Sequence, residues 1–134
     1  MEKESLEKAL KYIESMEMAI KYLEENKVKL VNDAVDYIIS TDSNYLKGLR
    51  KNDNLKLFKK SIIDGHIQWI IEDIYNPEKV DFTNYNLSFV KSTPQAYCNI
   101  YKYLSKNIKN NSNLSKNTKN ILQDYFTSFF NLYC

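Results

Sequence analysis

The 134-residue sequence is poor in the residues that interrupt regular structure. It contains two glycines and two prolines, too few turn-formers for a sandwich or barrel of many short strands. The chain length is that of one domain, with no room for a second. We therefore expect an all-α protein that folds as a single domain over residues 1–134.

Two other absences bear on the compartment. The two cysteines, Cys98 and Cys134, do not make a disulfide framework, and free thiols are typical of a reducing environment. No apolar run follows the charged N-terminus as a signal peptide would require. The uncharged stretch at residues 125–134 is about half of the ~20 residues that a membrane-spanning helix needs. We expect a cytoplasmic protein with no stable membrane insertion.

The charge balance argues against a polyanionic partner. Lys and Arg total 19 against 17 Asp and Glu, which gives a formal net charge of +2. Such a balance provides no basic surface of the kind that binds nucleic acid. Nucleic acid is therefore not an expected partner.

Apolar residues at steps of three and four indicate helices along most of the chain. Asn26 and Lys27 allow a break between the first two, and Gly65 lies inside the long helix at 53–75, where a close packing contact would explain it. Thr93 and Pro94 favour a helix start. The Asn-, Lys- and Ser-rich run at 107–120 is expected to be a surface loop. The expected helices cover about 6–25, 28–40, 45–49, 53–75, 94–107 and 121–133.

The last of these helices carries an apolar stripe wider than one contact requires. Either the domain covers it on two sides, or the last two helices form a dimer interface. Both interpretations are open from the sequence alone.

Constellations that would indicate catalysis are missing. The two glycines, Gly48 and Gly65, stand too far apart for a phosphate-binding loop. Asp64 and Asp73 fall on different turns of the expected helix, so they do not form a carboxylate pair. The one histidine, His66, has no second histidine or cysteine near it to complete a metal site. We expect a protein without enzymatic activity.

A few side chains could still line a binding site. Arg50 is the only forked donor for an anion, although a solvated surface cation is the commoner role. His66 on an apolar face is more often a hydrogen-bonded core histidine than a ligand. Aromatic residues with polar tips are expected in the core, where one hydroxyl could line a cavity: Trp69, Tyr97, Tyr101 and Tyr103.

The order of these helices resembles the sensor-globin pattern over roughly residues 28 to 105. The resemblance rests on a long helix ending Trp69-Ile70-Ile71-Glu72-Asp73-Ile74-Tyr75, followed by a helix that opens Thr93-Pro94-Gln95-Ala96-Tyr97. In haem-binding relatives the proximal histidine precedes the proline by about seven residues, a spacing that falls here on Leu87. Because no histidine stands there, the resemblance implies a globin-like domain without haem.

The combination is similar to the non-haem globin sensor domains of Bacillus sporulation sensor histidine kinases, and in size to the stand-alone, plasmid-encoded sporulation inhibitors that copy such a domain. That similarity implies a homodimer, a fatty acid in an apolar pocket, a halide such as chloride nearby, and inhibition of sporulation by competition with a histidine kinase. The expected ligand-binding residues are Arg50, His66, Trp69, Leu87, Lys91 and Tyr97. The alternatives are a haem globin gas sensor that uses His66 or Tyr85, and a helical interaction protein that holds no ligand.

Overall fold

Helices are the only regular secondary structure in the described part of the protein. The computed structural model describes residues 2–41, 54–77 and 94–134, of which 91% are helical and none lie in a strand. The all-α prediction is therefore confirmed for these residues. The globin-like arrangement and the dimer through the last two helices remain predictions.

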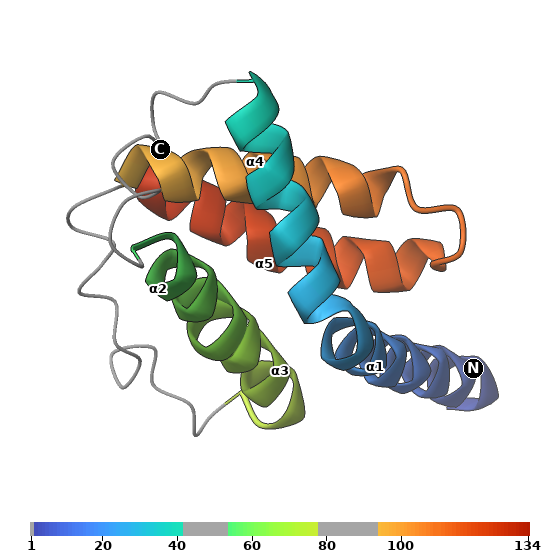
Figure 1. Ribbon diagram of the computed structural model, residues 1–134. Helices are drawn as coiled ribbons and strands as arrows, with labels where there is room; N and C mark the ends of the chain where they lie inside the picture. Colours follow the sequence, from blue (N-terminus) through green and yellow to red (C-terminus); the bar gives the residue numbers. More distant parts are fainter. Residues whose placement is uncertain (1, 42–53, 78–93) are drawn as a thin grey trace.

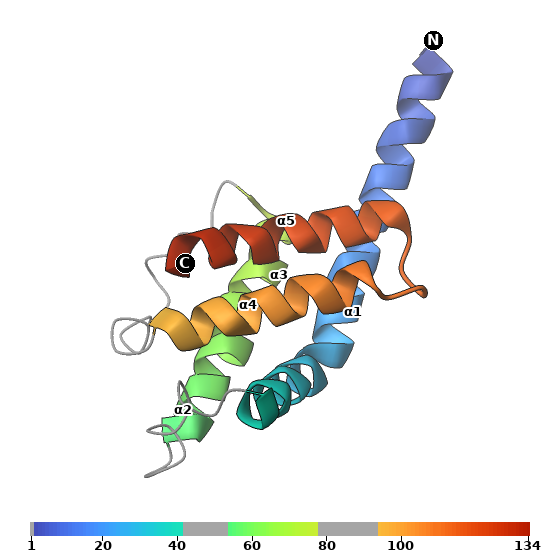
Figure 2. The same ribbon diagram turned by 90° about the horizontal axis from the view of Figure 1, so that it is seen from above.

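Helix α1 runs without interruption from Glu2 to Thr41 (Figure 1). The predicted break at Asn26 and Lys27 is wrong. The Asn26 side chain donates to the carbonyl of Tyr22 at 2.9 Å, so it bonds back along the helix instead of capping a new one. Figures 1 and 2 show that the helix changes direction along its length and that its N-terminal part extends beyond the other helices.

The second helical unit is continuous but changes its winding. It comprises α2 (Asn54–Lys60), the π-helix η2 (Ser61–Ile67) and α3 (Gln68–Tyr75). The predicted helix at 53–75 is thus confirmed, whereas the π-helical segment was not predicted. The close contact expected at Gly65 is wrong, because a Cβ atom added there would meet nothing within 4 Å.

The last two helices form an antiparallel hairpin. Helix α4 (Pro94–Lys109) begins at the predicted proline, and α5 (Lys116–Tyr133) returns alongside it (Figure 2). The loop between them is shorter than the predicted 107–120, because α4 continues to Lys109 and α5 begins at Lys116. Ser115 caps α5 by accepting a hydrogen bond from the Thr118 amide at 3.2 Å.

The hydrophobic core is shared by all of these units. Helix α5 packs against both α4 and α1, so two of its sides are covered within the chain. This accounts for the wide apolar stripe of α5 without a dimer. Buried side chains on the four helical units include Leu23, Val35, Phe58, Ile70, Ile100, Leu104, Leu122 and Phe126.

Within the described ranges, no helix is both long and apolar enough to cross a membrane.

The two cysteines are paired. Cys98, near the start of α4, and Cys134, just after α5, form a disulfide across the open end of the hairpin. The prediction that they are free thiols is wrong. It relied on the small number of cysteines, and the antiparallel hairpin brings two residues that lie 36 positions apart to the same end of the molecule. The cytoplasmic localisation, which was inferred from free thiols, loses that support.

Candidate functional site

His66 lies at the centre of a buried aromatic cluster. The π-helix η2 directs Ile62, His66 and Ile67 into the interior, at the four- and five-residue steps that π winding brings onto one face. The imidazole stacks on Phe129 with ring centroids 4.9 Å apart, and three tyrosine rings lie within 5.4 to 5.6 Å of it. We call this set the His66 cluster; it consists of His66, Tyr97, Tyr101, Phe129 and Tyr133.

Both ring nitrogens of His66 are hydrogen-bonded. Nδ1 pairs with the Tyr101 hydroxyl, and the Tyr133 hydroxyl lies 3.0 Å from Nε2. A neutral imidazole carries one proton, so one tyrosine donates to the ring and the other accepts from it. The expectation that His66 is a hydrogen-bonded core histidine is confirmed.

The cluster is electrically neutral near neutral pH. Burial lowers the pKa of His66 to about 3, because the imidazolium form would lose its hydration. Burial also raises the pKa of Tyr97 to about 12, against an opposing effect of its hydrogen bond with Ser61, and raises the pKa of Tyr101 well above its usual value. The lowered pKa means that the His66 imidazole is neutral at neutral pH and is a weaker base than an exposed histidine.

The other predicted site residues divide into two groups. Tyr97 is fully buried and lies in the His66 cluster, where its hydroxyl is 2.6 Å from Ser61 Oγ. Trp69 is partly buried, and its ring meets Tyr125 and Phe129 edge-on. Arg50, Leu87 and Lys91, together with the expected helix at 45–49, lie outside the described residues.

The described walls of the predicted apolar tunnel touch one another. The fatty acid was expected in a tunnel lined by the long helix, the Leu87 region and the Pro94 helix, with His66 and Tyr97 among the candidate partners of its carboxylate at the mouth. These two rings are in edge-on contact at 5.4 Å, and Phe58 lies 4.8 Å from Tyr97 on the other side. Aromatic side chains thus fill the space between these parts of η2 and α4, whereas the Leu87 region, the third expected wall, lies outside the described residues.

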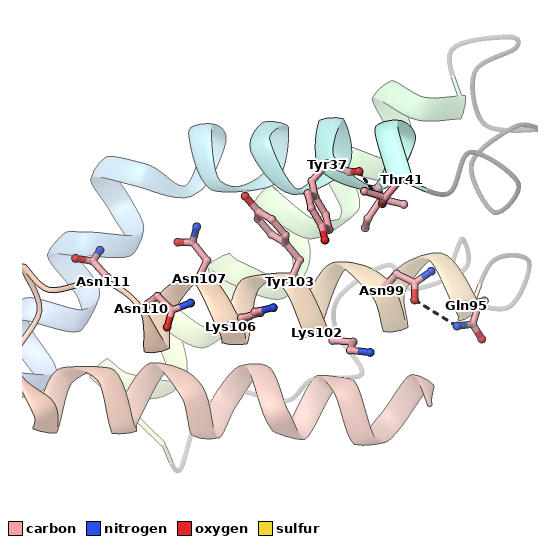
Figure 3. Close-up of a pocket in the computed structure, with 11 residues that line it drawn as sticks. Tyr37, Thr41, Gln95, Asn99, Lys102, Tyr103, Lys106, Asn107, Asn110 and Asn111 are labelled. Carbon is pink, nitrogen blue, oxygen red and sulfur yellow. Dashed lines mark hydrogen bonds between the residues drawn. The ribbon is translucent and has the colours of Figure 1, made fainter.

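A large groove opens on the opposite side of α4 (Figure 3). It has a volume of about 810 Å³ and runs between the C-terminal part of α1 and the outer face of α4. Residues of α4 one turn apart form one wall, and Tyr37 and Tyr103 meet across it with ring centroids 4.9 Å apart. The residues that line this α1/α4 groove are Tyr37, Ile38, Thr41, Gln95, Asn99, Lys102, Tyr103, Lys106, Asn107, Asn110 and Asn111.

The groove is polar and carries positive charge. Among the described residues that line it, Lys102 and Lys106 are the charged ones, and none carries a carboxylate. A second cavity of about 420 Å³ adjoins it, shares Asn107 and Asn111, and includes Asp33. Tyr103, one of the aromatic residues expected in the core, lines the α1/α4 groove.

Sequence reasoning missed this groove because it used the net charge of the whole chain. The small total of +2 conceals an uneven distribution: residues 82–123 contain six lysines and no Asp or Glu. On α4 itself, Lys102, Lys106 and Lys109 have no acidic residue among them. A charge count made segment by segment would have pointed to α4.

Within the three described ranges, no group of three or more His, Cys, Asp or Glu side chains could hold a metal ion. Comparisons of the chain with protein-family models, with curated proteins and with solved structures find no match. The resemblance to sensor globins therefore remains a prediction.

Proposed function

We propose that this chain is a non-catalytic sensor or interaction domain that recognises its ligand or partner at its surface, in the α1/α4 groove. The observation that carries this proposal is the contrast between the two sides of α4. The inner side meets η2 through the closely packed His66 cluster, whereas the outer side lines an open groove of about 810 Å³. A ligand can reach the outer side of α4 without displacing any core side chain.

The chemistry of the His66 cluster favours a structural role. A catalytic base needs a pKa near the working pH and access to its substrate. His66 has a pKa of about 3 and is 0% exposed, and its ring nitrogens are engaged by Tyr101 and Tyr133. Coordination of haem iron by His66 would also require one of these hydrogen bonds to break.

The test of this proposal is whether the interior admits an acyl chain. Organic extraction and native mass spectrometry of the purified protein are expected to find no fatty acid, and added palmitate is expected to leave the melting temperature unchanged. The Phe129→Ala variant provides a positive control, because it opens a cavity beside His66 that an acyl chain could enter. Leu132→Ala, on the same helix but at a 60% exposed side chain, is the matched control.

A second candidate is the fatty-acid sensor implied by the resemblance. One observation favours it: α4 begins at Pro94 and places Tyr97 against His66, so two of the expected pocket residues do come together. In this candidate a dimeric, cytoplasmic domain binds a fatty acid and chloride and inhibits sporulation by competing with a histidine kinase. A stoichiometric fatty acid in the unmodified protein would establish this candidate and refute recognition at the surface alone.

A further inference from the structure

The α1/α4 groove has the side chains of a site for a particular kind of ligand. Its charged groups are two ammonium ions, and most of its other polar groups are amides that can donate and accept hydrogen bonds. Figure 3 shows the amides distributed along the groove, from Gln95 near the start of α4 to Asn111 just beyond its end. The Gln95 and Asn99 amides are 3.4 Å apart, at the limit of a hydrogen bond, so a better partner would readily replace that contact.

The two groove lysines are a pair of positive charges with no acidic residue on their own helix. Lys102 and Lys106 are one helical turn apart, a spacing at which like charges repel by a few tenths of a kcal/mol. Both side chains are exposed, and α4 offers no acidic residue that could pair with either. An anion that bridges the two ammonium groups would relieve this repulsion.

The two lysine side chains indicate which type of anion the groove would bind. Among the described residues that line the groove, both cations are lysines, and a planar carboxylate is better matched by the fork of an arginine than by a lysine. Lysine acts as a point charge and is a common phosphate ligand, because a phosphate group presents oxygens in several directions. Two adjacent lysines thus favour a phosphate over a carboxylate.

Two tyrosines of the groove provide a surface on which a ring of a ligand could pack. Tyr37 and Tyr103 lie between α1 and α4 beside the lysines, with their ring planes inclined by 34° (Figure 3). Tyr37 is 51% exposed, so one face of the pair is open to a ligand, and Ile38 beneath it is buried. The groove volume of about 810 Å³ is in the range of cavities that hold small organic ligands.

We propose that the α1/α4 groove binds a nucleoside phosphate. The phosphate oxygens contact Lys102 and Lys106, the base or sugar packs on Tyr37 and Tyr103, and neighbouring amides such as Asn99 bind the ribose hydroxyls. This inference rests on the proposed function, since it names the ligand of the same surface site. It involves binding only, with no chemical step.

The experiment is a titration of the ¹⁵N-labelled protein with ADP at low ionic strength, followed by amide chemical shifts. We expect saturable shifts at residues of the groove. Adenosine, which lacks the phosphate, should bind at least tenfold more weakly, and inorganic phosphate alone should move the amides near Lys102 and Lys106. Equal affinity for adenosine and ADP, or shifts that do not map to the groove, would overturn the assignment.

Two variants with the same change in charge separate a specific site from general attraction. K102Q/K106Q removes both groove lysines and is expected to reduce ADP affinity at least tenfold, which corresponds to about 1.4 kcal/mol. K116Q/K119Q removes two lysines from α5 outside the groove and should change the affinity less than twofold. Equal losses in both variants would refute the site.

Failure of this ligand assignment is distinguishable from failure of the proposed function. The absence of ADP binding, with no fatty acid in the purified protein, would overturn the nucleoside phosphate and leave recognition at the surface intact. A fatty acid found in the interior of the unmodified protein would instead overturn the proposed function, whatever the result with ADP.

Discussion

The disulfide between Cys98 and Cys134 should contribute a large part of the stability of this domain. It closes a loop across 36 sequence positions. In the chain-entropy treatment, a cross-link over a loop of that length stabilises the native state by about 4 kcal/mol, because the unfolded chain loses freedom. Native domains are typically stable by about 5 to 15 kcal/mol, so reduction should remove a substantial fraction.

The measurement is urea denaturation of three samples monitored by circular dichroism: the oxidised protein, the same protein under reducing conditions, and the C98A/C134A variant. We expect both samples without the disulfide to be less stable than the oxidised protein by about 4 kcal/mol. For a chain of 134 residues this corresponds to a decrease in melting temperature of roughly 10 to 14 °C.

Two results would refute the reasoning. One is a difference between the oxidised and reduced protein of less than about 1 kcal/mol, because the loop-closure term would then be missing. The other is titration of two free thiols in the native protein before any reductant is added, since the structure pairs both cysteines. Agreement between the reduced protein and C98A/C134A excludes an effect of the alanine side chains.

Three further predictions concern single residues. Because the pKa of His66 is lowered to about 3, unfolded chains bind a proton below about pH 6.5 that folded chains do not. Stability should therefore decrease as the pH falls from 6.5 toward 3, by up to about 1.4 kcal/mol per pH unit, and His66→Gln should abolish this slope in denaturation curves. Gly65→Ala should stabilise the protein by about 0.5 to 1 kcal/mol, because the added methyl group meets no atom within 4 Å; a loss of stability in thermal melts would contradict the open space. Ser115→Ala should cost about 1 kcal/mol through loss of the cap on α5, and a melting temperature equal to that of the unmodified protein would exclude this role.

Helical periodicity correctly predicted the helices that bury an apolar face. It failed at positions where the hydrogen bonds of local polar side chains determine whether a helix begins, ends or continues. The stripe at 53–75 and the start of α4 at Pro94 were confirmed, because core packing and proline geometry determine them. Asn26 was expected to interrupt the first helix, but its amide finds an acceptor one turn back in the same helix. The polar run at 107–120 was expected to be a loop, although Ser115 supplies the cap that allows α5 to begin at Lys116.

The candidate site could be predicted only in part, since it depends on contacts between distant segments. That His66 would be a hydrogen-bonded core histidine followed from its apolar neighbours, whereas its partners Tyr101 and Tyr133 lie 35 and 67 positions away. The π-helical winding that aims His66 at them has no clear signature in the sequence. The α1/α4 groove also joins two remote helices, and only the absence of acidic residues around Lys102 and Lys106 indicated it.

The disulfide and the His66 cluster both involve the last turn of α5. We therefore expect the redox state of Cys98 and Cys134 to affect the packing around His66. Cys98 follows Tyr97 and Cys134 follows Tyr133, and these two tyrosine rings lie 5.3 Å apart beside His66. The bond therefore fixes the last turn of α5, which would otherwise fray as helix ends do. Release of Tyr133 would remove the hydrogen bond to Nε2 and admit water, so the pKa of His66 should return toward its ordinary value in the reduced protein. A His66 titration that NMR finds identical in the oxidised and reduced protein would show that packing alone holds this turn. The search for a bound fatty acid must accordingly include both redox states, because the contacts of the His66 cluster are those of the chain with its disulfide formed.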